Sequence, residues 1–280
     1  MGAFFRKIDA VSESNVIVNV PHAGVEIPPE VAPTLSAPRE DWMRDVDFAV
    51  DEIVCDAPDG GATLLASQIS RFVVDLNRAP TDVPRDAYPD ASEPLPTISY
   101  GRRGLIWLET TRGVPALRGH LTDTQFEQRM AYYTPYHALL ASLIEERRQR
   151  FGASVLIDGH SMPSMGQSGH GDTGVRRADI VLGDFDGQSC APQLTLTVEQ
   201  CLLELGFEVV RNRPYRGGYD TEHYGKPDSS VHALQIEINR ALYMDEDEVS
   251  TIASGLTRVR EAMAEVVRRV VALRLGCSRA

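Results

Sequence analysis

Short apolar runs rich in β-branched residues alternate with segments of helical periodicity along most of this chain. This alternation predicts an α/β fold in which a mixed, mostly parallel central sheet is flanked by helices. The runs expected to form strands are residues 16–20, 62–65, 72–75, 155–158, 180–182, 208–210 and 233–238. No internal repeat or low-complexity linker divides the 280 residues, so we expect one domain spanning residues 1–280.

Periodicity and capping residues predict three longer helices. Thr124 and Glu127 have the spacing of a capping box, and the helix that follows them is expected to end at Gly152. A second helix is expected to end at Gly206. A third is expected within residues 248–275, where apolar residues recur every three or four positions.

The composition excludes several classes of partner. The formal net charge is −12, which disfavours nucleic acid and anionic membrane surfaces because both require a basic face. No apolar run is long enough to span a bilayer. The four cysteines show no CxxC spacing and no signal peptide precedes them, so a reducing, cytoplasmic location is expected. An anionic small molecule would have to be held by a few local arginines.

Two histidines follow strand-like runs within a few residues. His22 follows residues 16–20, and His160 follows residues 154–157 through an Asp-Gly pair. Open α/β sheets bind ligands at the carboxyl ends of their strands. Two imidazoles that meet at that edge predict a metal site, whereas either one alone is more typical of a hydrogen-bonded structural histidine.

A metal site of this kind needs a third ligand. The His-x-x-Glu spacing of carboxypeptidases is absent, because Val25 stands three residues after His22 and Glu26 comes one residue later. Asp45 and Asp47 precede a helical pattern, where acidic residues also serve as caps. We predict Asp47 as the ligand because Asp45 is the better placed of the two to be the cap, and Asp45 and Glu26 stay as alternatives.

Glu237 is a carboxylate within the otherwise apolar strand-like run LQIEI. Burial of a charge costs several kcal/mol unless the charge is paired or used, and it raises the pKa of a carboxyl group toward neutrality. A general base needs such a pKa. The structural alternative is an ion pair with Arg240 or another arginine.

Arginines near expected strand ends could hold a carboxylate substrate. Asn77 and Arg78 end the block that begins at residue 70 and also contains Arg71, and Arg216 lies in a glycine-rich loop. A guanidinium group binds a carboxylate through two parallel hydrogen bonds. The proline-rich residues 79–103 follow directly and are expected to form a wall or lid of the site.

Six sequence blocks, in order between about residues 15 and 246, support a family resemblance. They are PHAG at 21–24, SRFVVDLNR at 70–78, DGHSMPS at 158–164, DIVLGD at 179–184, PYRGGY at 214–219 and VHALQIEINR at 231–240. Together they resemble the N-formylglutamate amidohydrolase (deformylase) family. Six blocks in the same order are far more specific than any one of them.

The resemblance implies a fold and mechanism similar to those of zinc carboxypeptidases and aspartoacylases, with one zinc ion. In this comparison His22 and His160 match the two histidine ligands, and Glu237 matches the general base on a strand. Asn77 and Arg78 match the pair that holds a substrate carboxylate. The expected fold is therefore a zinc-carboxypeptidase-like α/β domain.

The implied reaction is hydrolysis of N-formyl-L-glutamate to formate and L-glutamate, a late step in one route of histidine breakdown. Zinc would activate water, Glu237 would transfer the proton, and Asp47 is assigned by its order in the chain as the third ligand. Pro163 stands where dedicated histidine-pathway enzymes are expected to carry arginine, so another N-acyl amino acid or small amide is an alternative substrate. A non-catalytic protein that binds small carboxylates is the alternative of another class.

Overall fold

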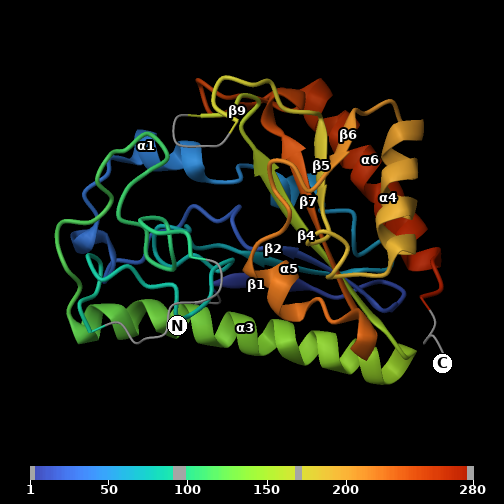
Figure 1. The fold of residues 1–280 in the computed structure, drawn as a ribbon, viewed down its shortest axis with the longest axis horizontal. Coiled ribbons are helices and arrows are strands. Elements are labelled where there is room, and N and C mark those ends of the chain that lie inside the picture. The colour runs from blue at the N-terminus through green and yellow to red at the C-terminus, as the bar shows by residue number, and fades with distance from the viewer. Residues whose placement is uncertain (1–3, 91–98, 168–171, 276–280) are drawn as a thin grey trace.

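The computed structural model describes residues 4–90, 99–167 and 172–275, which include a seven-stranded mixed sheet (Figure 1). The order across the sheet is β1-β3-β2-β4-β7-β5-β6. The pairs β1–β3 and β5–β7 are antiparallel and the other four are parallel, which confirms the predicted mixed, mostly parallel sheet. The strands are β1 (Phe5–Ile8), β2 (Val16–Val20), β3 (Thr63–Ser67), β4 (Ser154–Met162), β5 (Ile180–Gly183), β6 (Val209–Arg211) and β7 (Val231–Asn239).

The strand predicted at residues 72–75 does not form. Val73 is fully buried, but its backbone N–H bonds to the carbonyl of Ser70, so the segment turns instead of extending. The apolar run reflected burial alone. Strand β1 was not predicted, because a half-buried edge strand with Arg6 and Lys7 on it lacks an apolar run.

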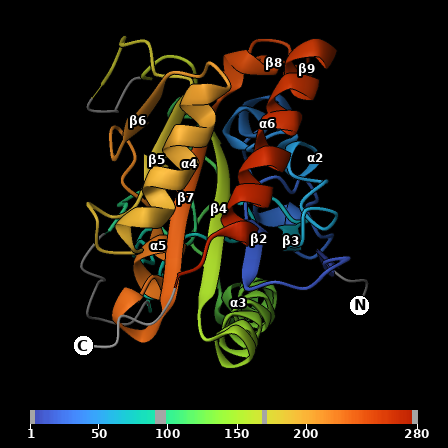
Figure 2. The same cartoon turned by 90° about the vertical axis from the view of Figure 1, so that its right-hand side faces the viewer.

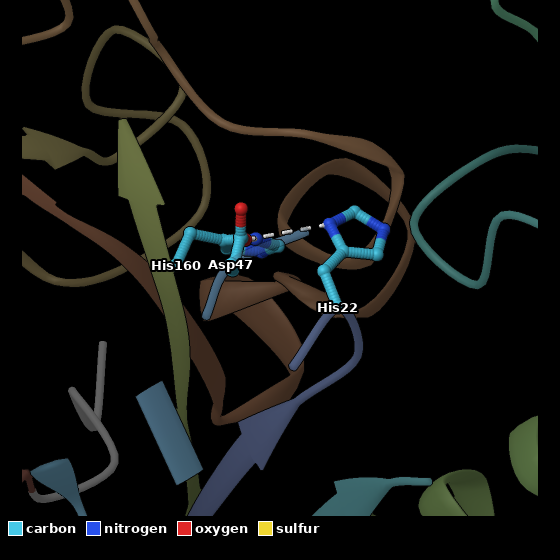
Figure 3. A group of neighbouring side chains, drawn as sticks. All are labelled: His22, Asp47 and His160. Atoms are coloured by element: carbon cyan, nitrogen blue, oxygen red, sulfur yellow. Dashed lines mark hydrogen bonds and ion pairs between the residues drawn. The ribbon is translucent and has the colours of Figure 1, made fainter. Parts of the chain in front are cut away.

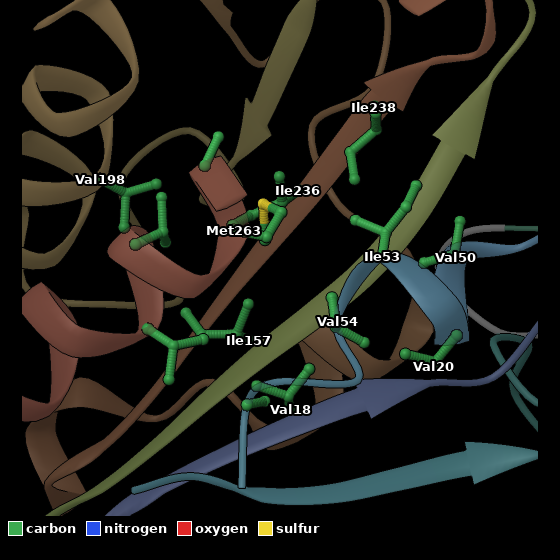
Figure 4. Packing of buried hydrophobic residues seen from close by; sticks show 14 of the residues in the cluster. Val18, Val20, Val50, Ile53, Val54, Ile157, Val198, Ile236, Ile238 and Met263 are labelled. Carbon is green, nitrogen blue, oxygen red and sulfur yellow. The ribbon is translucent and has the colours of Figure 1, made fainter. Parts of the chain in front are cut away.

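Helices cover both faces of the sheet. Helix α3 (Asp123–Phe151) packs against one face, where it buries Tyr136 and Leu140. Helices α4 (Pro192–Glu204) and α6 (Ala253–Ala272) pack against the other face and lie side by side in Figure 2. Figure 4 shows the core on that second face, which joins α2 (Val50–Ile53) and α6 to the central strands.

Alternate residues of the central strands enter the two cores. Val18 of β2 and Ile157 of β4 face α4 and α6, whereas Ile17 and Leu156 face α3. This period of two is the geometry of a strand buried on both sides. Asp158 and His160 of β4 and Gln235 and Glu237 of β7 therefore lie on the α3 side, on the same face as Leu156.

The predicted helix ends are partly confirmed. The capping box of α3 is formed by Thr122 and Gln125, not by Thr124 and Glu127, because the helix begins two residues earlier. Its predicted end is correct, since Gly152 adopts a left-handed conformation with φ of 80°.

The other predicted helix boundaries also differ in detail. Helix α4 ends just before Gly206, as predicted, whereas α6 begins at Ala253 instead of residue 248. The residues before it form β9 (Ser250–Thr251), paired with β8 (Met244–Asp245). The remaining short elements are α1 (Arg39–Trp42), α5 (Tyr219–Tyr224) and 3₁₀ helices at Ala32–Thr34, Met43–Asp45, Pro227–Ser229 and Arg240–Leu242.

Neither bilayer spans nor disulfides are found in the described residues. Within that part of the chain, none of the helices combines the length and apolarity that crossing a membrane demands. Cys55, Cys190 and Cys201 are free thiols, and Cys277 lies outside the described residues.

Candidate metal centre and active site

A cavity of about 380 Å³ opens beside the carboxyl ends of β2, β4 and β7. Strands β4 and β7 are parallel neighbours in a register that pairs His160 with Glu237. His22 follows β2 by two residues and reaches the same edge. Seven of the eight site residues predicted from the sequence line this cavity: His22, Asp47, Arg71, Asn77, Arg78, His160 and Glu237.

His22, Asp47 and His160 form a buried group that could hold a metal ion (Figure 3). One potential ligand atom from each lies within 4.8 Å of the other two. Oδ2 of Asp47 is 2.9 Å from Nδ1 of His160 and 3.6 Å from Nδ1 of His22. Two imidazoles and one carboxylate are the donor set of many catalytic zinc sites, which leave a further position open for water or substrate.

The hydrogen bonding of the two histidines fits a metal between them. Nδ1 of His22 is buried and has no hydrogen-bond partner, which is costly for a nitrogen that turns toward Asp47. The other ring nitrogen of each histidine lies close to a second carboxylate. Nε2 of His22 is 2.6 Å from Asp75, and Nε2 of His160 is 2.9 Å from Asp158. Such carboxylates fix the ring orientation of metal-binding histidines and increase their basicity.

The other candidates for the third ligand do not join this group. The carboxylate of Asp45 accepts hydrogen bonds from the backbone N–H and the hydroxyl of Thr111. Asp45 ends a 3₁₀ helix and caps no helix, since the residue before α2 is Ala49. Glu26 is exposed, and its backbone pairs with Ile69. Within the described residues, the geometry therefore groups Asp47 alone with the two histidines.

The charges of this group are tightly coupled. Burial acts to raise the pKa of Asp47, but His160 and His22 outweigh it and hold the pKa below its ordinary value. Burial acts to lower the pKa of His160, whereas Asp158 and Asp47 raise it well above its ordinary value. A divalent cation would take over the role of the imidazolium proton between these groups.

Glu237 is buried on β7, with 7% of its surface exposed. Burial raises the pKa of its carboxyl group to about 7, although His160 and Arg240 nearby act to lower it. Oε1 accepts a hydrogen bond of 2.8 Å from Nε2 of Gln235, and the amide oxygen of Gln235 is held in turn by the backbone N–H of Gly218. A carboxyl group held in this way has the pKa expected of a general base near neutral pH.

The structural alternative for Glu237 was an ion pair with Arg240, but Arg240 pairs with Asp47 instead. Arg240 lies 3.2 Å from Asp47 and donates to the hydroxyl of Ser161 and to the carbonyls of Arg44 and Val46. Arg240 thus helps to hold Asp47 in place.

The predicted substrate-binding arginines have different surroundings. Arg71 makes two hydrogen bonds to Asp75 and lies over Trp107. Arg78 lies over the ring of Tyr100 at 3.6 Å and lines the cavity. Arg216 is outside the cavity lining, where it is 3.2 Å from Asp186 and stacks on Phe185.

Asn77 faces the metal-binding group. Its Nδ2 lies 3.0 Å from Nε2 of His160 and 3.4 Å from Asp158, and its oxygen accepts the backbone N–H of Asp220. Gly218 permits this packing, because a Cβ there would lie 2.5 Å from the amide of Asn77. Asn77 therefore packs against His160 and donates to Asp158 in addition to lining the cavity.

Several residues of the site were missed by sequence reasoning. Asp158, which begins the DGHSMPS block, and Asp75, which ends a predicted strand, contact the two histidines outside the cavity lining, and both had a signal. Of the cavity residues, Tyr215 lies in the PYRGGY block, whereas Trp107 carried no signal. Arg103 and Tyr100 belong to the predicted wall at residues 79–103 and do line the cavity, whereas residues 91–98 of that segment lie outside the described residues.

Comparison with known proteins gives the family. Residues 14–244 match the family model of N-formylglutamate amidohydrolase. This chain belongs to the N-formylglutamate amidohydrolase family. The resemblance predicted from six sequence blocks is thereby confirmed.

Relatives in the N-formylglutamate amidohydrolase family are similar over most of their length. The N-formylglutamate deformylases of Pseudomonas putida and Pseudomonas aeruginosa are each 31% identical, and the alignments cover 87% and 91% of this chain and 86% and 91% of theirs. The crystal structure of N-formylglutamate amidohydrolase from Ralstonia eutropha JMP134 superposes with a TM-score of 0.86 at 30% identity, covering 96% of this chain and 98% of that one. A protein from Agrobacterium tumefaciens shares the fold at 20% identity and a TM-score of 0.63, with 95% of each chain covered.

Proposed function

We propose that this protein is a zinc-dependent amidohydrolase that cleaves N-formyl-L-glutamate to formate and L-glutamate. The names of its relatives support the substrate. The observation that carries the mechanism is the unpartnered Nδ1 of His22, which faces Asp47 in the same cavity as the buried carboxyl group of Glu237. A single catalytic domain over residues 1–280 is part of this proposal.

In the proposed mechanism, Nδ1 of His22, Nδ1 of His160 and the carboxylate of Asp47 would hold a zinc ion. Bound zinc supplies Lewis acidity, which lowers the pKa of water and polarises a carbonyl group. Asp75 and Asp158 keep each far imidazole nitrogen protonated, so that both Nδ1 atoms are free to act as ligands.

Glu237 is the proposed general base. It accepts the proton of the attacking water and then delivers it to the departing amine nitrogen. Its pKa of about 7 matches both steps, since the group can be ionised before the first and protonated before the second. Gln235 holds one carboxylate oxygen, which leaves the other available to the reacting water.

Cationic and amide N–H groups of the cavity bind the substrate carboxylates in this proposal. Arg78 is the principal donor, because it lines the cavity and its hydrogen bonds within the protein go to carbonyl oxygens. Asn77 lines the same cavity and supplies a further N–H group. The predicted contact of Arg71 with substrate stays a prediction, since its side chain makes two hydrogen bonds to Asp75. The predicted contact of Arg216 with substrate stays a prediction, since its side chain is paired with Asp186 outside the cavity lining.

The test is formate release from N-formyl-L-glutamate by the zinc-loaded protein and by a Glu237→Gln variant. We expect turnover by the first and a loss of at least about 100-fold in kcat by the second, because general base catalysis contributes that much. Zinc content is measured in both, since Glu237 is not a ligand and the variant should keep the metal.

Each other outcome has a distinct meaning. Turnover of N-acetyl or other N-acyl amino acids, but not of N-formyl-L-glutamate, would replace the substrate and keep the chemistry. Binding of glutamate without hydrolysis of any N-acyl amino acid at full zinc occupancy would favour the non-catalytic alternative. Equal activity of the Glu237→Gln variant would reject Glu237 as the base.

A further inference from the structure

Asp82 fixes the segment that carries Arg103 along one wall of the cavity. The Asp82 carboxylate accepts hydrogen bonds from the hydroxyl of Ser99 and the backbone N–H of Tyr100, and its carbonyl accepts the N–H of Leu105. Gly104 packs so closely that a Cβ there would lie 2.2 Å from the carbonyl oxygen of Asp82. The backbone of Arg103 is therefore held on both sides.

The side chain of Arg103, by contrast, has no polar partner in the described part of the chain. It is half-buried and lines the cavity. The neighbouring Arg102 is exposed and paired with Glu109 at 2.7 Å, outside the cavity lining. Desolvation of a guanidinium group without a counter-ion is unfavourable, so a half-buried, unpaired arginine in a cavity is suited to an anionic ligand.

Two of the other cavity arginines are already paired with carboxylates. Arg71 is bound to Asp75 through two hydrogen bonds, and Arg240 is bound to Asp47 and to backbone carbonyls. Arg78 retains donors that are not bound to a carboxylate, since its nearest one, Asp75, is 4.0 Å away. Two arginines thus remain for a substrate with two carboxylates.

Arg78 and Arg103 are neighbours on one wall of the cavity. Asp75 contacts His22 at 2.6 Å and lies 4.0 Å from Arg78, whose Nε donates to the backbone carbonyl of Arg103 at 3.1 Å. Arg78 is thus linked to the metal-binding group through Asp75, and Arg103 contributes its unpaired side chain to the cavity beside it. In N-formylglutamate the α-carboxylate is on the carbon attached to the scissile nitrogen, and the γ-carboxylate lies two methylene groups beyond it.

We propose that Arg103 binds the γ-carboxylate and makes the site selective for acidic N-acyl amino acids, while Arg78 binds the α-carboxylate. This inference rests on the proposed function and specifies its substrate class. It also assigns the γ-carboxylate to a residue far in sequence from Pro163, the position where dedicated histidine-pathway enzymes are expected to carry arginine.

The experiment compares N-formyl-L-glutamate with N-formyl-L-glutamine, which has nearly the same shape but no γ-charge. The variants are Arg103→Gln and, as a matched control, Arg102→Gln, which removes the same charge one residue away from the cavity. We expect Arg103→Gln to lower kcat/KM for N-formylglutamate roughly 10- to 100-fold and to leave N-formylglutamine within about threefold. Arg102→Gln should change neither value by more than about twofold, and Arg78→Gln should lower both.

An equal loss on both substrates, or no loss on either, would overturn the assignment of Arg103. If the wild-type protein hydrolyses neither substrate, the proposed function fails on its own, and calorimetric binding of L-glutamate and L-glutamine to the zinc-loaded protein replaces turnover. A preference for glutamate that disappears in Arg103→Gln alone would then support the inference, and a preference retained by that variant would reject it.

Discussion

The carboxylate of Asp75 accepts a 2.6 Å hydrogen bond from Nε2 of His22, on the side of the ring opposite Asp47. Its second oxygen is bound by Arg71 and by the indole N–H of Trp107. Burial acts to raise the pKa of Asp75, but Arg71 and Arg78 outweigh it and keep the pKa well below its ordinary value. Asp75 is therefore an ionised acceptor that fixes which nitrogen of His22 faces the metal-binding group.

Asp75→Asn should weaken zinc binding by about 10- to 100-fold, because an amide orients the imidazole less well and does not increase its basicity. Zinc affinity measured by competition with a chelator tests this. Asp45→Asn is the matched control, since Asp45 lines the same cavity but binds Thr111. Equal zinc affinity of wild type and Asp75→Asn would show that the contact is not used to hold metal.

The pH dependence of kcat/KM should show an acid limb set by Glu237. A general base must be ionised, so activity falls as the pH drops through the pKa of about 7. Bound zinc, being positive, moves this limb to lower pH. Initial rates between pH 5 and 8.5, with zinc content measured at each pH, test the expectation, and a flat profile at constant zinc content would contradict it.

Glu237→Gln should stabilise the metal-free protein at alkaline pH. The carboxyl group has a higher pKa when folded, about 7, than when unfolded, so the folded state binds more protons between pH 4.5 and 7 and stability falls as the pH rises through that range. Gln has no such loss, which gives a difference on the order of 3 kcal/mol at pH 8 and little at pH 4.5. Thermal unfolding at the two pH values measures it, and a variant less stable than wild type at pH 8 would refute it.

Thr122→Ala should destabilise the protein by about 1 kcal/mol, because it removes the side-chain acceptor of the Gln125 N–H at the start of α3. Thr124→Ala should be close to neutral, since that exposed residue lies within the first turn and caps nothing. Urea unfolding of the two variants side by side distinguishes them. Because Ala has the higher helix propensity, equal losses in the two variants would reject the capping role of Thr122.

Local patterns were sufficient for most of the fold and for the metal-binding group. Runs such as 16–20 and 155–158 are continuous because both faces of the central strands are covered, and the histidines behind them share one sheet edge as a direct result. The strand predicted at residues 72–75, which does not form, shows the limit of this reasoning. An apolar run indicates burial, but it does not distinguish a strand from a buried turn.

Local patterns did not indicate which arginines line the cavity with free hydrogen-bond donors. Arg216 pairs with Asp186, and Arg102 pairs with Glu109, both outside the cavity lining. The side chain of Arg103 lines the cavity and has no polar partner in the described residues. These outcomes depend on which carboxylates the fold brings near each guanidinium. In the sequence alone, Arg102 and Arg103 are equivalent.

The register that pairs His160 with Glu237 makes these two strand residues harder to change than the loop residues of the cavity. The proposed ligand and base belong to the hydrogen-bonded ladder of β4 and β7, where a shift of one residue would turn each side chain to the other face of the sheet. Tyr100, Arg103 and Tyr215 lie outside the strands, where substitutions and insertions are tolerated far more readily. A change of substrate is therefore expected to come from the loops of the cavity, while the sheet keeps the proposed ligand and base in register.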